Sequence, residues 1–147
     1  MSLKSRIQED MKSAMRAAAK ERLGTIRMLM AAIKQREVDE RIELDDLQIL
    51  SVIDKMVKQR RESIAQFEAG GRQDLVARES EELRQLSDYL PAQLSDAELD
   101  ALISEAIATT AASSIKDMGK VMGLIKSKAQ GRADMGAVGA RIKAKLS

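Results

Sequence analysis

The sequence lacks several residue types on which catalytic and metal sites commonly depend. Its 147 residues include no cysteine, no histidine and no tryptophan. Without cysteine, neither a disulfide framework nor a thiolate metal site can form. Without histidine, the side chain most often used for proton transfer near neutral pH is missing. We therefore expect no catalytic residue, no metal site, no cofactor and no catalytic activity of the chain's own.

The remaining signals for chemistry are weak. Ser127 has lysines on both sides, but adjacent positions of a helix do not face each other, which argues against a Ser–Lys dyad. Carboxylates at 45–46 and 79–82 lie in charge-rich stretches, and we interpret them as solvated surface rather than as a cation site. The segment "GGRQDL" lacks the Gly–Lys–Ser/Thr pattern of a phosphate-binding loop.

Long apolar runs are also missing. A membrane-spanning helix needs about 20 consecutive, mostly apolar residues, and no uncharged run approaches that length. The basic N-terminal segment contains Glu9 and Asp10 and has no apolar signal core, which argues against a transit peptide. The expectation is a cytoplasmic protein with no membrane partner.

Aromatic residues and proline are nearly absent, with one Phe, one Tyr and one Pro. Leu, Ile, Met, Val and Ala dominate instead, together with Lys, Arg and Glu, which is a helix-forming composition. Apolar residues recur at intervals of three and four along seven segments, and no segment alternates as a strand does. These patterns predict an all-α protein.

The predicted helices fall into two parts. Four helices up to about residue 90 include two long ones, which predicts antiparallel hairpins in a domain over 1–90. Pro91 disfavours helix at the residue before it and marks the boundary. Three shorter helices then predict a small bundle over 91–147, beginning with a capping box at Ser95 and Glu98. Further boundary residues are Gly70 and Gly71 after the third helix, Ser114 or Asp117 as cap of the sixth, Gly131 at its end, and Asp134 as cap of the seventh.

Charge is distributed unevenly between these parts. Residues 1–90 hold 17 basic and 17 acidic side chains, whereas residues 116–147 hold eight basic and two acidic ones. A basic terminal segment on a neutral body favours an anionic partner. A solvated helical surface explains the charge alone equally well.

Two glycines lie within the predicted sixth helix, where each costs about 1 kcal/mol relative to alanine. At about 100° per residue, Gly119 and Gly123 fall with Lys126 on a flank of the apolar stripe that contains Val121 and Ile125. One interpretation is that the glycines admit a neighbouring helix. The other is that an external surface lies against the bare backbone while the nearby basic side chains contact its phosphates.

A second basic group lies around the end of the third helix, formed by Lys58, Arg60, Arg61 and Arg72. It is a candidate ridge for an anionic partner. Nearby acids such as Glu62 and Glu68 can pair with these cations along the helix, and we favour that interpretation.

Four blocks of the sequence resemble the GatB/YqeY family, and most closely its stand-alone YqeY-like proteins. They are "IQEDMKSAMRAAAKERLGTIRMLMAAIKQREVDER", "KQRRESIAQFEAGGRQDLVARESEEL", "LSDYLPAQLSDAEL" and "MGKVMGLIKSKAQGRAD". The C-terminal part is similar to the GatB tail domain of the glutamine-dependent aspartyl/glutamyl-tRNA amidotransferase. One departure from the family pattern is Met135, which separates Asp134 from Gly136.

The resemblance implies a non-catalytic accessory protein that binds tRNA or another structured RNA, with an amidotransferase or translation-related protein as a further partner. The family label of carbon–nitrogen ligase belongs to catalytic domains that these residues do not resemble. The predicted nucleic-acid-binding residues are Gly119, Lys120, Gly123, Lys126, Lys128, Gly131 and Arg132.

Two alternatives stay open. The sixth and seventh helices with their glycine turn mimic a helix-turn-helix, which would make Arg141, Lys143 and Lys145 the DNA-contacting cations. The long N-terminal helices would otherwise serve as a protein-interaction scaffold that needs no nucleic acid.

Overall fold

The computed structural model describes residues 2–147, which form α-helices joined by short loops and no β-strand. The prediction of an all-α protein is confirmed. The chain divides into two compact units, Met1–Leu90 and Pro91–Ser147. The helices are α1 (Leu3–Arg16), α2 (Lys20–Glu40), α3 (Asp46–Ala69), α4 (Gln73–Ser87), α5 (Asp96–Thr110), α6 (Met118–Ala129) and α7 (Met135–Leu146), with a 3-10 turn at Ile115–Asp117.

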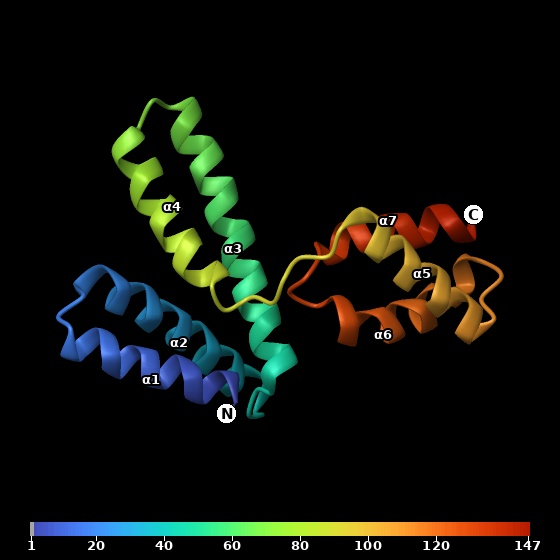
Figure 1. Cartoon of the computed structure of the whole chain (residues 1–147), viewed down its shortest axis with the longest axis horizontal. Helices are drawn as coiled ribbons and strands as arrows, with labels where there is room; N and C mark the ends of the chain where they lie inside the picture. The colour runs from blue at the N-terminus through green and yellow to red at the C-terminus, as the bar shows by residue number, and fades with distance from the viewer. Residues whose placement is uncertain (1) are drawn as a thin grey trace. The chain divides into compact units, whose positions relative to one another are not determined.

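The N-terminal unit consists of two antiparallel helical hairpins, α1 with α2 and α3 with α4 (Figure 1). Ile7, Leu29 and Ile53 are among the residues of its core, and none is more than 1% exposed. Burying side chains of this size stabilises a fold by about 1.5–3 kcal/mol each. The hairpins therefore share one apolar core, as the spacing of these residues along the sequence predicts.

The ends of these helices follow local chemistry. The carboxylate of Asp45 accepts from the amide of Gln48, whose side chain in turn accepts from the amide of Asp45, so α3 begins with a capping box. Gly71 adopts φ +71° just after α3, as expected of a glycine that ends a helix. The first helix ends at Arg16, because Ala18 turns to φ +53°, whereas the apolar spacing alone predicts a helix as far as Ala18.

The C-terminal unit packs α5, α6 and α7 around a separate core that includes Ile103, Ile125 and Ile142. The predicted capping box is confirmed, since Glu98 and Ser95 exchange hydrogen bonds of 3.1 Å between side chain and backbone. Asp134 caps α7 as predicted, accepting from the amide of Gly136 at 2.9 Å. Met135 therefore does not disturb this cap.

The start of α6 differs from the prediction. A 3-10 turn precedes the helix, and the carboxylate of Asp117 points back to accept from the amides of Ser113 and Ser114 at 3.0 and 3.3 Å. Asp117, at the N-cap position of α6, makes no side-chain cap bond to that helix. Ser114 and Asp117 instead form a capping box one turn earlier, at the 3-10 turn that leads into α6. Asp117 therefore stabilises the 3-10 turn before α6 and not the first turn of α6 itself.

Candidate nucleic-acid interface

Helix α6 has one buried face and one bare face. Val121, Ile125 and Ala129 are at most 1% exposed and face the core of the unit. Gly119 and Gly123 lie on the exposed surface, as the angular spacing predicts. The bare face also contains Ser127, one turn after Gly123, so small residues follow one another at intervals of four along it. We call this row of Gly119, Gly123 and Ser127 the small-residue strip.

No other part of the described structure uses the space above these two glycines. A Cβ atom built on Gly119 or Gly123 would have no heavy atom within 4 Å outside the helix's own nearby backbone. Gly139 of α7 differs, since a Cβ there would lie 3.6 Å from the side chain of Met118. Close packing of a neighbouring helix therefore does not account for Gly119 and Gly123 among residues 2–147.

Lysines border the strip, and they have no acidic partners. Lys120, Lys126 and Lys128 are exposed, and none takes part in an ion pair among the described residues. The amides of Ser113 and Ser114 hold the pKa of Asp117 below its usual value, so this carboxylate stays charged near Lys120. The uncompensated positive charge of α6 therefore lies mainly at its C-terminal half.

Two of the predicted binding residues serve the turn after α6. Gly131 is buried and has φ +78°, a backbone conformation that favours glycine. Arg132 donates from Nε to the carbonyl of Ala92 at 2.8 Å, while its own carbonyl accepts from the amide of Leu94 at 2.8 Å. Gln93 donates to the carbonyl of Gly131 at 2.9 Å. These bonds hold the segment that follows Pro91 against the turn after α6. The sequence did not reveal this structural role of Gly131 and Arg132, because the bonded residues are about 40 positions apart.

The cations of α7 are largely engaged within the unit. Arg141 donates to Asp100 at 3.0 Å and to Asp96 at 2.6 Å, both on α5. Lys145 donates to the hydroxyl of Ser104 at 3.0 Å. A DNA-reading helix needs its basic side chains directed at base edges. The arrangement thus gives little support to the helix-turn-helix alternative, because two of its three proposed contacts, Arg141 and Lys145, are engaged and only Lys143 is exposed without a side-chain bond among residues 2–147.

The basic ridge considered on α3 is also partly neutralised. Arg60 lies within 3.4 Å of Glu79 and 3.2 Å of Glu82 on α4, and all three side chains are mostly buried. Arg72 pairs with Asp74 at 3.2 Å. Two of the four cations are therefore paired with acids, in agreement with the interpretation favoured above, although the partners lie on α4 rather than along α3.

The sequence interpretation missed one apolar residue next to the strip. Leu124 is 42% exposed on α6, and Ile115 of the same unit is 45% exposed. The available signal in the sequence was the spacing of four residues that places Leu124 between Lys120 and Lys128 on one side of the helix. An exposed leucine between lysines offers apolar contact to a partner that the lysines attract.

Other site types have little support in the part of the chain that the structure describes. No cluster of three or more acidic side chains is arranged to hold a metal ion among residues 2–147. None of the helices there combines the length and the apolar character that crossing a membrane requires.

Comparison with known proteins identifies relatives across nearly the whole chain. The YqeY-like protein family matches residues 4–146. Similar curated proteins are named altered inheritance of mitochondria protein 41, mitochondrial. The one from Lachancea thermotolerans is 38% identical over 67% of this chain and 54% of its own length. The relative from Eremothecium gossypii is 40% identical over 58% of this chain and 48% of its own length. The relative from Pyrenophora tritici-repentis is 33% identical over 87% of this chain and 71% of its own length.

These relatives correct one expectation. They are named mitochondrial, which contradicts the cytoplasmic location inferred from the absence of a recognisable targeting segment. The acidic residues Glu9 and Asp10, which argued against a transit peptide, were therefore a poor basis for predicting the compartment. The chain spans about half the length of the first curated relatives that it matches. With a match that extends from residue 4 to residue 146, the chain belongs to the YqeY-like protein family.

Proposed function

We propose that the C-terminal unit binds structured RNA, of which tRNA is the type the family resemblance favours, through the bare face of α6. The strongest support is the open space above Gly119 and Gly123. Gly123, in the interior of α6, weakens the helix, and neither glycine eases a contact among residues 2–147. An RNA backbone that must lie close to the helix would explain why glycine occupies both positions.

The charges beside the strip suit a phosphate backbone. Lys126 and Lys128 are exposed and lack acidic partners, so binding phosphates would not require breaking ion pairs. Recognition would depend on shape, because the chain has one Phe, one Tyr and no Trp on which to stack unpaired bases. The protein would then handle RNA without performing chemistry on it, and amide transfer would belong to other proteins.

A charge-reversal experiment tests this proposal. We expect the Lys126→Glu, Lys128→Glu double variant to bind mixed tRNA about tenfold or more weakly than the parent in a filter-binding titration, because phosphate contacts dominate such affinity. The matched control is Lys20→Glu, Lys55→Glu, which changes net charge equally at two exposed positions of the N-terminal unit outside the basic ridge of α3. Equal losses in both variants would mean that total charge, and not the face of α6, determines binding.

The protein-interaction alternative has its own readout. Partners recovered by the full chain after nuclease treatment, together with no measurable tRNA affinity, would replace the RNA-binding proposal. Competition between tRNA and duplex DNA would separate RNA binding from the helix-turn-helix alternative.

A further inference from the structure

A pocket of about 310 Å³ lies within the N-terminal unit, where α1, α2 and the end of α4 meet. Its volume is at the lower end of the range for pockets that bury small ligands. The polar part of its lining consists of Arg6, Asp10, Arg22, Thr25, Gln85, Asp88 and Tyr89. None of these residues belongs to the α6 face, so a ligand in this pocket would be independent of the proposed function.

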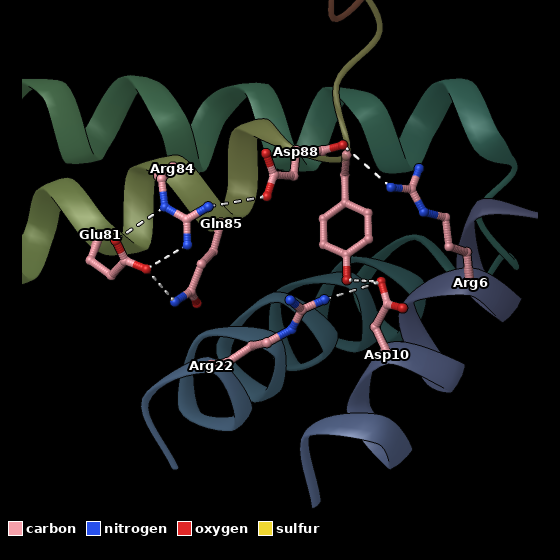
Figure 2. A network of polar contacts seen from close by, with 8 residues as sticks. Arg6, Asp10, Arg22, Glu81, Arg84, Gln85 and Asp88 are labelled. Carbon is pink, nitrogen blue, oxygen red and sulfur yellow. Dashed lines mark hydrogen bonds and ion pairs between the residues drawn. The ribbon is translucent and has the colours of Figure 1, made fainter. Parts of the chain in front are cut away.

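Tyr89 fixes an acidic group in this pocket. Its hydroxyl donates to Asp10 at 2.6 Å, and the guanidinium of Arg6 lies 4.9 Å from the centre of its ring (Figure 2). Burial raises the pKa of Tyr89, and the bond to Asp10 raises it further, so the hydroxyl remains a donor. The contacts of Asp10 with Tyr89 and Arg22 both use the same oxygen, Oδ2, which leaves Oδ1 available as an acceptor.

Two guanidinium groups near this acid have unused donors. Arg22 comes no closer than 3.8 Å to Asp10, too far for a hydrogen bond. Arg6 makes one long bond of 3.4 Å to the carbonyl of Asp88. An arginine has five N–H donors in a planar fork that matches the oxygens of a carboxylate. Most of the donors of this pair therefore lack a partner.

Gln85 supplies an unused acceptor. Its amide nitrogen donates to Glu81 at 3.2 Å, while its Oε1 is buried and accepts no hydrogen bond. In Figure 2 this oxygen is on the side of the amide nearer Arg22, and both residues line the pocket. A buried acceptor without a hydrogen bond destabilises the fold, and a donor on a bound ligand would remove that cost.

We propose that this pocket binds a small zwitterion of the α-amino acid class. Its carboxylate would accept from Arg22 and Arg6, and its ammonium group would donate to Asp10 and Gln85. The lining favours a ligand with both charges, because Asp10 repels a simple anion and the two arginines repel a simple cation. Asp88 adds a second carboxylate to the lining, because Arg84, 3.6 Å from it, also pairs with Glu81 at 2.6 Å, so acids and arginines balance in the pocket.

The test is a calorimetric titration of the full chain with a panel of free L-amino acids. The best binder is then compared with its N-acetyl derivative, its amide derivative and inorganic phosphate. We expect binding only when both charges are present. Affinity should fall about tenfold or more in Arg22→Ala and in Asp10→Asn, because each loses a charge-assisted contact.

Arg27→Ala is the matched control, as Arg27 is an exposed arginine of the same helix outside the pocket. It should bind like the parent. Arg22 is half exposed, so its removal leaves the core intact even where the Asp10 variant loosens the contact with Tyr89. The proposal is overturned if no amino acid binds at millimolar concentration, if phosphate or the N-acetyl derivative binds as well as the parent ligand, or if Arg27→Ala weakens binding equally.

Discussion

The two units use their positive charges differently. In the N-terminal unit, eight of the 17 cations form ion pairs with acids of the same or another helix among the described residues, as when Arg60 lies between Glu79 and Glu82. In the C-terminal unit the ion pairs of the described residues all involve Arg141, and the lysines of α6 have none. A cation that already has an acid contributes to the fold. One without an acid is free to meet an external anion.

The comparison also separates two types of glycine. Gly131 permits the turn after α6 through its positive φ, so the fold itself requires it. Gly123 lies in the middle of α6 and nothing in the described structure approaches it. Gly24 of α2 is equally open, so open space alone does not mark a glycine as functional. What distinguishes Gly123 is its position beside lysines that form no ion pair among the described residues.

The largest expected effect comes from the core of the smaller unit. Ile103 is fully buried there, and an isoleucine-to-alanine change in a core costs about 2–5 kcal/mol. A unit this small has little stability in reserve. We therefore expect Ile103→Ala to remove hydrogen-exchange protection from residues 91–147 while residues 2–90 keep theirs. Equal loss of protection in both units would show that they unfold together.

The next effect compares a paired cation with an unpaired one. Arg60→Ala removes the one cation that pairs with Glu79 among the described residues and leaves Glu82 only Arg78, 3.8 Å away, although the two acids are only 23% and 15% exposed. We expect a loss of about 2 kcal/mol in the free energy of unfolding, measured by urea denaturation. Lys126→Ala should change that free energy by less than about 0.5 kcal/mol. Comparable losses would contradict the distinction between structural and available cations.

A smaller effect concerns the salt dependence of RNA binding. If Lys126 contacts a phosphate, Lys126→Ala should reduce the slope of log affinity against log salt by about 1, because one fewer counterion is released. Lys143→Ala on α7 is the control, since Lys143 is an exposed lysine of the same unit outside the α6 face. A slope unchanged in Lys126→Ala, or reduced equally in both, would remove Lys126 from the interface.

Sequence reasoning succeeded where the determining interactions are local. Helical spacing located the flank of Gly119 and Gly123, and the pair Ser95 and Glu98 fixed the start of α5. It failed where partners lie far apart in the chain. The bond from Tyr89 to Asp10 joins residues 79 positions apart, and no local pattern predicts it. The role of Asp117 was also misjudged, because its carboxylate accepts from the preceding amides of Ser113 and Ser114 rather than from the first turn of α6.

The smallest change gives the most selective test of the bare face. Gly123→Ala adds a Cβ atom that meets nothing within 4 Å, at an interior position of α6. Alanine favours helix over glycine by up to about 1 kcal/mol, so thermal denaturation should show a more stable C-terminal unit. If an RNA backbone must lie against this position, the same methyl group should weaken tRNA binding roughly tenfold, equivalent to about 1.4 kcal/mol.

A control for this test exists in the other unit. Gly24 is an exposed glycine within α2, and a Cβ atom there also meets nothing within 4 Å. Gly24→Ala should raise stability similarly and leave tRNA binding unchanged. A general effect of helix rigidity on binding would lower affinity in both variants. Stabilisation without loss of affinity in Gly123→Ala would mean that no ligand approaches the strip. Only opposite changes in stability and affinity, confined to Gly123→Ala, would assign the glycine to close approach by RNA.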